Sequence, residues 1–310
     1  MYIISLMGKL IVVGTASNVA KTISRDIKII ISAFDRFDDI NFFIVESDSS
    51  DDTVKKLQEL KSTIPKFEFK SVGVLSNRLL YKVARLRYCR NVYVEYVRML
   101  AKNEQPEFVV VADLDGINKS LSKKAVDSCF INSDWGAVAA NQSRGYYDIC
   151  ALRANNWQQG DCFVELGLHK ANIVNLAPLK SELLNKIKLI YLYDRARVHA
   201  IYSKMKKIPR DSPWIRVDSA FGGLAIYKTA AFLSGDYSSY EDDKDSEHVS
   251  FNKKIIANGH AIYINPRLIN SHWNEHNLYK HWLVRELRNA IYRSKSLVVI
   301  YKSIKKLLKW

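Results

Sequence analysis

Two carboxylates stand two residues apart, at Asp113 and Asp115, with Leu114 between them and a mainly apolar run before them. Side chains at this spacing can both reach one hard cation, because Mg²⁺ and Mn²⁺ take oxygen ligands and keep positions open for phosphate oxygens. A metal ion held there would neutralise the charge of a diphosphate leaving group. The alternative interpretation is a turn whose aspartates only cap the next element. The position of the pair, after V-V-V-A and before Gly116, favours the metal site.

A second polar cluster, Glu46-x-Asp48 followed by Ser50-x-x-Thr53, comes after another apolar run. A carboxylate at Glu46 or Asp48 can accept hydrogen bonds from a nucleobase N–H or from ribose hydroxyls. Capping of the next helix by Ser50 or Asp51 is the alternative interpretation. The two interpretations are compatible, because the capping residues are not those assigned to the ligand.

Small residues, Gly14, Thr15 and Ala16, follow the first apolar run. Their size permits close approach of a nucleotide to the backbone. The segment is neither a GxGxxG sequence nor a P-loop, so it predicts no dinucleotide or Walker-type site.

Four other positions carry groups that could take part in chemistry. Arg90 and Asn91 lie in a basic stretch and could hold a diphosphate or a ribose. Glu247 opens a predicted helix, where a carboxylate can serve as general base toward a hydroxyl or bind the acceptor, or can simply compensate the helix dipole. His272 follows the last predicted strand and is a candidate third metal ligand, although a single histidine is more often structural.

The elements that would position these residues alternate between apolar runs and helical segments. In the first half we expect helices at 15–34, 51–60 and 77–102 and strands at 9–13, 41–46, 66–74 and 107–112. This alternation indicates an α/β fold with a mainly parallel sheet flanked by helices. Ligands of such sheets bind beyond the carboxyl ends of the strands, which is where the polar clusters fall.

The second half is less regular. We expect a helix at 245–258, a helical insertion or lid at 180–207, and strands at 135–140, 221–227 and 261–264, the last of them stopped by Pro266. No repeat and no linker divides the chain.

Composition sets limits on the class of protein. The 310 residues are 48% apolar and 25% charged, ordinary values for a globular protein that exclude a disordered or fibrous chain. The four cysteines match no zinc or redox motif and predict reduced thiols. No run of 18 uncharged apolar residues exists to span a membrane, and the apolar start of the chain reads as a strand rather than a signal peptide.

The net charge of +15 is concentrated near the carboxyl end. Residues 280–310 hold nine Lys or Arg against one Glu, with apolar residues at helical spacing. We expect residues 277–310 to form a basic amphipathic helix and residues 278–310 to bind an anionic membrane surface. The alternative is a helix packed on the domain with a solvated basic face. No nucleic-acid-binding motif is present, so no nucleic acid is expected as a partner.

Together these segments resemble GT-A-type nucleotide-sugar glycosyltransferases, most strongly the mannosyltransferase-like group of capsule and surface-polysaccharide enzymes. The resemblance covers residues 8–275 and is carried by V-V-G-T-A-S-N, V-E-S-D-S-S-D-D-T, R-Y-C-R-N, V-V-V-A-D-L-D-G, F-G-G-L-A-I-Y, S-E-H-V-S-F-N and I-N-P-R. It implies a Rossmann-like GT-A domain over residues 1–276, with a donor half at 1–116 and an acceptor half at 117–276.

The resemblance also implies roles for residues. Asp113 and Asp115 would hold Mn²⁺ or Mg²⁺, with His272 at the metal-ligand position of some members. The nucleotide sugar would contact Gly14, Thr15, Ala16, Glu46, Asp48, Arg90, Asn91, Leu114, Gly222 and Gly223. Glu247 would take the acidic acceptor-side position. Many inverting members have Glu-Asp where this chain has Glu247-His248, so Asp218 and Asp148 remain candidate bases.

The expected function is therefore metal-dependent transfer of a sugar from a UDP- or GDP-linked donor to a hydroxyl of a surface polysaccharide or lipid-linked oligosaccharide. We expect a cytoplasmic protein, peripheral to the inner face of the membrane. A sugar nucleotidyltransferase is one alternative, although such enzymes usually carry a Gly-rich basic loop that Gly14–Asn18 lacks. A non-enzymatic binder of nucleic acid or acidic glycan is the other, and it would leave Asp113, Asp115 and Glu46 without a role.

Overall fold

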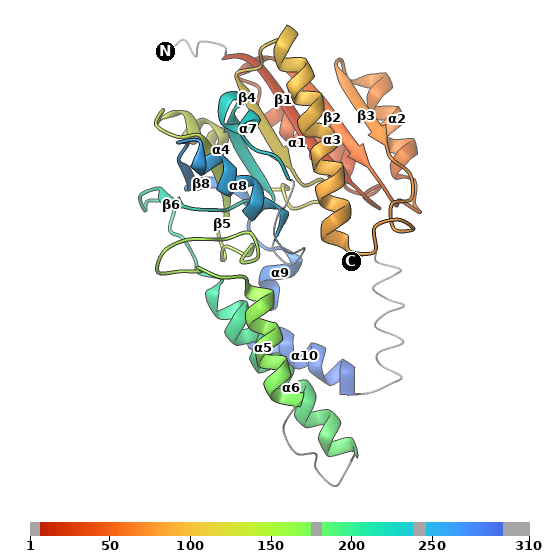
Figure 1. Cartoon of the computed structure of the whole chain (residues 1–310), viewed down its shortest axis with the longest axis vertical. Coiled ribbons are helices and arrows are strands. Elements are labelled where there is room, and N and C mark those ends of the chain that lie inside the picture. Colours follow the sequence, from red (N-terminus) through yellow and green to blue (C-terminus); the bar gives the residue numbers. More distant parts are fainter. Residues whose placement is uncertain (1–6, 175–181, 238–245, 294–310) are drawn as a thin grey trace.

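The computed structural model describes residues 7–174, 182–237 and 246–293. These residues form one eight-stranded sheet in the order β3-β2-β1-β4-β7-β5-β8-β6 (Figure 1). The strands are β1 (Met7–Ala16), β2 (Phe37–Glu46), β3 (Phe67–Ser71), β4 (Phe108–Ala112), β5 (Ala137–Gln142), β6 (Ile215–Val217), β7 (Leu224–Lys228) and β8 (Ile262–Ser271).

Six of the eight strands run in one direction, and only β6 and β7 oppose them. Their shared direction brings the carboxyl ends of β1, β2 and β4 to one edge of the sheet, which we call the carboxyl edge. The expected α/β fold with a mainly parallel sheet is confirmed, and the sheet crosses both predicted halves of the domain without a break.

Helices cover both faces of the sheet. Successive side chains of a strand point to opposite faces, and the buried strands are apolar throughout, so both faces must be shielded from water. One core joins the strands to α3 (Lys82–Asn103), α7 (Thr229–Leu233) and α8 (Glu247–Ala257). The other joins them to α1 (Ile23–Ala33), α2 (Thr53–Thr63) and α4 (Lys123–Asp127), which leads into the short helix η1 (Ser128–Phe130). Figure 1 shows the long helix α3 lying across the first of these faces.

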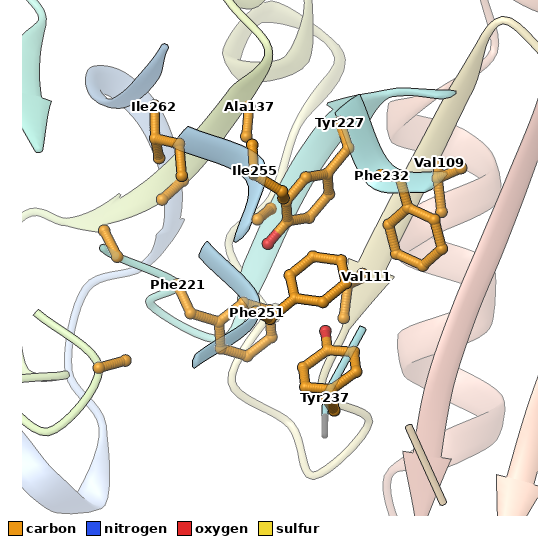
Figure 2. Packing of buried hydrophobic residues seen from close by; sticks show 14 of the residues in the cluster. Val109, Val111, Ala137, Phe221, Tyr227, Phe232, Tyr237, Phe251, Ile255 and Ile262 are labelled. Atoms are coloured by element: carbon orange, nitrogen blue, oxygen red, sulfur yellow. The ribbon is translucent and has the colours of Figure 1, made fainter. Parts of the chain in front are cut away.

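Aromatic rings fix α8 to the sheet (Figure 2). Phe251 of α8 stacks on Tyr237 with ring centroids 4.3 Å apart and meets Tyr227 of β7 edge-on at 5.7 Å. Phe232 of α7 lies 5.3 Å from Phe251. Such ring pairs stabilise beyond their buried area, so the first turn of α8 is held at the carboxyl edge.

A helical arm extends beyond the carboxyl edge (Figure 1). It contains α5 (Cys162–Val174), α6 (Glu182–Ala200), the short helix η2 (Tyr202–Lys204) and α10 (Trp282–Arg293), with α9 (Glu275–Leu278) leading into it. The helical insertion expected at 180–207 corresponds to α6 and η2, whereas the sequence did not predict α5. Of the predicted C-terminal helix, residues 294–310 lie outside the described residues. No described helix combines the length and the apolar character needed to cross a bilayer.

Several predicted boundaries differ from the structure by a few residues, among them the start of α3 at Lys82 and the end of β3 at Ser71, and two differences have a clear physical reason. The predicted stop at Pro266 fails, because β8 continues to Ser271. The β5–β8 ladder shifts register between Ile264 and Ile269, so the missing N–H of Pro266 interrupts no bond, and its carbonyl accepts from the Asn141 side chain at 3.0 Å. The predicted helix at 15–34 begins only at Ile23, since β1 extends to Ala16.

Gly222 allows the chain to turn into β7 close to β5. Its φ is +70°, and a Cβ built there would lie 2.6 Å from the Ala140 carbonyl oxygen. Gly223 has φ +83°, and its Cβ would lie 2.8 Å from the Ile117 side chain. The Gly-Gly pair is therefore required by the backbone, whatever else it contacts.

We predict that Gly222→Ala destabilises the fold by more than Gly73→Ala. Both glycines have φ +70°, but a Cβ at Gly73 would meet nothing within 4 Å. Left-handed backbone at a non-glycine residue costs about 1–3 kcal/mol, and only Gly222→Ala adds a clash with backbone. Chemical denaturation of both variants measures the difference in the free energy of unfolding, and equal losses would contradict the close approach.

Candidate active site

The loops that follow β1 and β2 are joined by hydrogen bonds. Ser47 N–H donates to the Ala16 carbonyl at 3.1 Å, and Asn18 N–H donates to the Ser49 hydroxyl at 3.1 Å. Val19 N–H donates to the Thr53 hydroxyl at 2.8 Å. The loop after β1 and the loop after β2, which carries the Glu46–Thr53 cluster, therefore lie side by side at the carboxyl edge.

Glu46 and Asp48 are held mainly by their own chain. The Glu46 side chain is buried and accepts hydrogen bonds from Ser49 N–H, at 3.1 Å, and from the Ser71 hydroxyl. Asp48 adopts a left-handed conformation, with φ +57°, and accepts from Ser76 N–H at 2.8 Å. Partial burial raises the pKa of Asp48. The hydrogen bonds from Ser76 and Ser47 and the charge of Arg85 outweigh this effect and hold the pKa below its ordinary value.

The small residues at the end of β1 let other parts of the protein approach closely and do not line an open space. A Cβ at Gly14 would lie 2.5 Å from the Ala112 carbonyl oxygen, so this glycine lets β4 end beside β1. Ala16 is buried in the core, and Thr15 is partly exposed. Of the three, Thr15 is the one that presents a side chain toward solvent at this edge.

The Asp113–Gly116 loop is anchored from α1. The Thr22 hydroxyl donates to the carbonyl of Leu114 at 2.8 Å, and Gly116 N–H donates to the Asp26 carboxylate at 2.7 Å. Leu114 is buried, whereas Asp115 is exposed and accepts from Ile117 N–H at 3.2 Å. These contacts fix the backbone between the two aspartates while leaving the Asp115 carboxylate accessible.

Asp26 is a site-forming residue that sequence reasoning missed. It is fully buried, and burial raises its pKa to about 6, which the bond from Gly116 only partly opposes. The signal was present in the sequence: the carboxylate interrupts the buried stripe of Ile23, Ile27 and Ile30 on one helical face.

Arg90 connects the Asp113 loop to α8. Its guanidinium is 3% exposed, with Nη2 3.5 Å from the Asp113 carboxylate and Nε 3.2 Å from the Glu247 carboxylate. Nη1 donates to the Tyr93 hydroxyl at 3.0 Å. Because these contacts bring α3, the end of β4 and the start of α8 to one point, the structure unites three residues that the sequence predicted separately.

Further carboxylates surround Asp113. Burial raises the pKa of Asp113 to about 7; Arg90 opposes this, while the negative charges of Asp115, Asp148 and Glu247 add to it. Asp148 accepts from Gly222 N–H at 3.0 Å and Ala151 N–H at 3.3 Å, yet burial still raises its pKa. A group of carboxylates that repel one another, with one exposed at Asp115, is a donor set suited to a hard divalent cation.

Three buried amides, which the sequence did not reveal as a group, support this loop. Asn118 donates to the Asp113 carbonyl at 2.7 Å and accepts from Asn270 at 2.9 Å. Gln142 donates to the Asn270 side chain at 3.0 Å and to the Gly222 carbonyl at 2.9 Å. The ends of β4, β5 and β8 and the turn into β7 are thereby locked together.

His248 does not substitute for an acidic residue. It is buried and stacks on Phe221 with ring centroids 3.9 Å apart. Burial, and then the charge of Arg90, lower its pKa well below the ordinary value, so the ring is neutral at physiological pH.

The remaining predicted residues are not part of the group around Asp113. The carboxylate of Asp218 is exposed and makes no described contact with the Asp113 group, and its backbone N–H donates to the Arg153 carbonyl at 2.8 Å. Asn91 accepts from Tyr237 N–H at 2.8 Å. His272 is exposed, with Nδ1 2.6 Å from the Ser143 hydroxyl. Within the described ranges, Asp113, Asp115 and His272 do not form a set whose ligand atoms all lie within 4.8 Å.

Comparisons with known proteins give weak structural similarities. No family model matches the chain, and no curated protein matches its sequence. The mannosyltransferase PcManGT from Pyrobaculum calidifontis, solved with GDP-Man and Mn²⁺, is 14% identical over 92% of this chain and 62% of that one, with a TM-score of 0.46. TarS of S. aureus is 16% identical over 83% of this chain and 57% of that one, with a TM-score of 0.39.

Glucosyl-3-phosphoglycerate synthase from Mycobacterium tuberculosis, solved with UDP, is 12% identical over 91% of this chain and 79% of that one, with a TM-score of 0.37. The chain thus spans less than two thirds of the length of TarS and of PcManGT. With TM-scores below 0.5, these similarities establish neither an activity nor a ligand for this chain.

The raised pKa of Asp113 predicts a dependence of stability on pH. Without metal, the folded protein keeps a proton on Asp113 up to pH about 7, whereas the unfolded chain releases it near its ordinary value of 3.8. The folded state binds more protons in this window, so the free energy of unfolding should fall as pH rises from about 4 to 7. Asp113→Asn should flatten the curve by up to about 1.4 kcal/mol per pH unit, measured by denaturation in EDTA.

Mg²⁺ should act in the opposite direction, because it binds the ionised carboxylates. The increase in the protein's melting temperature caused by Mg²⁺ should therefore become larger from pH 6 to pH 8 in the wild type and should vanish in Asp113→Asn. Asp134→Asn, at an exposed aspartate before β5, is the matched control. If the free energy of unfolding changed with pH in the same way in the wild type and in Asp113→Asn, the raised pKa assigned to Asp113 would be contradicted.

Proposed function

We propose that the chain is a metal-dependent glycosyltransferase. It moves a sugar from a UDP- or GDP-linked donor to a hydroxyl of a surface polysaccharide, such as a capsule or lipopolysaccharide, or of a lipid-linked oligosaccharide. The observation that carries the proposal is the convergence of Asp113, Asp115 and Glu247 at the carboxyl edge, with the buried Arg90 between two of them. Ligands of open parallel sheets bind at this edge.

The donor side is built from the Asp113–Gly116 loop. Asp113 and Asp115 would hold Mn²⁺ or Mg²⁺, which supplies charge neutralisation for a diphosphate leaving group when it is bound. Arg90 keeps the Asp113 carboxylate in place, and the anchors from Thr22 and Asp26 keep the loop backbone in place. In this proposal Thr15 and Asp48 face the nucleoside, since both are partly exposed, whereas Glu46 is buried and bonded to Ser49 and Ser71.

The acceptor side offers two carboxylates near Asp113. Glu247 lies at the start of α8, 3.2 Å from Arg90 Nε, and its carboxylate can accept the hydroxyl proton. Burial raises the pKa of Asp148, so its ionised form is a stronger base than an ordinary aspartate. Its place beside the Gly222 turn supports an acceptor-side role. Asp218 lacks such a neighbourhood, so we assign the proton transfer to Glu247 or Asp148.

We also propose that α10 attaches the protein to an anionic membrane surface. Its polar side is turned inward: Arg288 Nη2 lies 2.6 Å and Arg285 Nε 3.3 Å from the buried carboxylate of Asp194 on α6. Its apolar side is turned outward, with Trp282, Leu283 and Leu287 each more than 60% exposed. This orientation is the reverse of the packed helix with a solvated basic face that the sequence offered as the alternative.

An outward apolar face with tryptophan, followed by a basic segment, matches the chemistry of a membrane interface. Residues 294–310, which belong to the proposed membrane segment, lie outside the described residues. The proposed location is the cytoplasmic face of the membrane, where a lipid-linked acceptor and a soluble nucleotide sugar can meet.

We predict that Asp115→Asn lowers sugar transfer by at least about 100-fold, the usual effect of losing one group that stabilises developing charge. The measurement is metal-dependent release of UDP or GDP from a panel of donor sugars, with water or a glycan as acceptor. Asp134→Asn is the control for loss of one negative charge and should keep full activity. Full turnover of Asp115→Asn with any active donor would contradict the metal assignment.

We predict that Leu283→Asp combined with Leu287→Asp weakens binding to phosphatidylglycerol vesicles by at least about 10-fold. Burial of one leucine side chain stabilises by about 1.5–3 kcal/mol, and aspartate also repels the anionic surface. Sedimentation of the full chain with vesicles measures the change. Ile131→Asp, at an exposed apolar residue beyond η1, is the control and should bind as the wild type does. Unchanged binding of the double variant would remove α10 as the contact surface.

A further inference from the structure

The helical arm has little apolar core of its own. Four buried apolar residues, Leu166 and Ile173 of α5 with Ala196 and Ala200 of α6, form a cluster separate from the two cores of the sheet. A two-helix unit with so few buried side chains gains little from burial, and small units of this kind commonly need an additional cross-link. Polar contacts between α5 and α6 must therefore contribute to holding the two helices together.

Three side chains with metal-ligating atoms meet between these helices. Glu165 and His169 are four residues apart on α5, so they lie on one helical face. His199 comes from the last turn of α6, with its Nε2 3.4 Å from a Glu165 oxygen and its ring centroid 4.7 Å from that of His169. One ligand atom from each of the three lies within 4.8 Å of the others, the only such set among residues 7–174, 182–237 and 246–293.

The donor set selects the class of metal. Two imidazoles and one carboxylate suit Zn²⁺, whereas Mg²⁺ requires oxygen ligands. Ligands at about 2.0–2.2 Å around a tetrahedral ion stand roughly 3.3–3.5 Å apart, which the His199–Glu165 pair already matches. Lys204 Nζ pairs with the second oxygen of Glu165 and leaves the first oxygen turned toward the histidine. Such an outer contact is a usual way of orienting a ligating carboxylate.

The site is open on one side. A cavity of about 740 Å³ adjoins it, lined by His169 and His199 together with Tyr191, Asp194, Arg195 and Arg285. Water or an anionic group could therefore complete the coordination. We propose that Glu165, His169 and His199 bind one Zn²⁺ ion that fastens α5 to α6, with its fourth position open to the cavity. This site is separate from the carboxylate group at Asp113.

Two cysteines near the start of α5 are another possible zinc site and must be distinguished from this one. The sulfur atoms of Cys150 and Cys162 lie 3.3 Å apart, and both thiols are free. The hydrogen bond between the two thiols, followed by burial, raises the pKa of Cys150 well above its ordinary value. Because zinc binds the thiolate form, the two cysteines are the poorer site at neutral pH.

The experiment is zinc titration of the full chain, without a polyhistidine tag, in competition with a chromogenic zinc indicator. We expect one equivalent of Zn²⁺ to bind to the wild type and to raise the melting temperature. His169→Ala and His199→Ala should each weaken binding at least 100-fold and abolish the thermal shift. His281→Ala, at an exposed histidine outside the arm site, and Cys150→Ser are the matched controls and should bind as the wild type does.

Co²⁺ in place of Zn²⁺ provides a second measurement, because a tetrahedral nitrogen and oxygen site gives visible absorption without the intense near-ultraviolet band of a thiolate ligand. Equal zinc stoichiometry and affinity in the wild type and in His169→Ala would overturn the proposal. So would loss of binding in Cys150→Ser. Metal-free melting temperatures of the variants near that of the metal-free wild type establish that each variant is folded, so that weaker binding reports on the ligands.

Discussion

The geometry of the carboxyl edge depends on the buried guanidinium of Arg90. A charge that is 3% exposed is stable only where it is compensated, and here Asp113, Glu247 and the Tyr93 hydroxyl surround it. Phe221 and Tyr237 add ring faces 5.4 and 5.6 Å from the guanidinium carbon. Because these partners come from α3, the end of β4, the turn before β7 and the start of α8, a single cation sets their relative positions.

The same arrangement explains why a basic protein has an acidic site. The chain carries a net charge of +15, yet Asp115, Asp148 and Glu247 gather around Asp113, and Arg90 contacts two of these four carboxylates. Burial and mutual repulsion raise the pKa of Asp113, and a divalent cation relieves that repulsion. A nucleic-acid-binding module would have no use for carboxylates at this point, since they repel phosphate unless a metal intervenes. The surplus of positive charge lies elsewhere, above all beyond residue 280, where the apolar side of α10 faces outward.

Sequence reasoning located seven of the eight strands and the edge, because apolar runs followed by polar clusters identify the buried strands of a parallel sheet. It missed β6, which is only three residues long. It could not locate Asp26 or the amides Asn118, Gln142 and Asn270 as parts of one site, since their partners are distant in sequence. It also assigned Gly14 to a ligand, whereas the space beside Gly14 is filled by the carbonyl of Ala112. The orientation of α10 depends on Asp194, an isolated acidic residue in α6 that no helical periodicity connects to Arg288.

Binding of a nucleotide through a metal ion is the claim on which the proposed function depends. Its most direct test is the melting temperature of the full chain with UDP, GDP, CMP and dTDP and their common sugar conjugates, each with and without Mn²⁺. The account predicts a rise with one nucleotide series, present with Mn²⁺ and lost in Asp115→Asn. No rise with any nucleotide, while the protein is folded and Mn²⁺ is present, would contradict it.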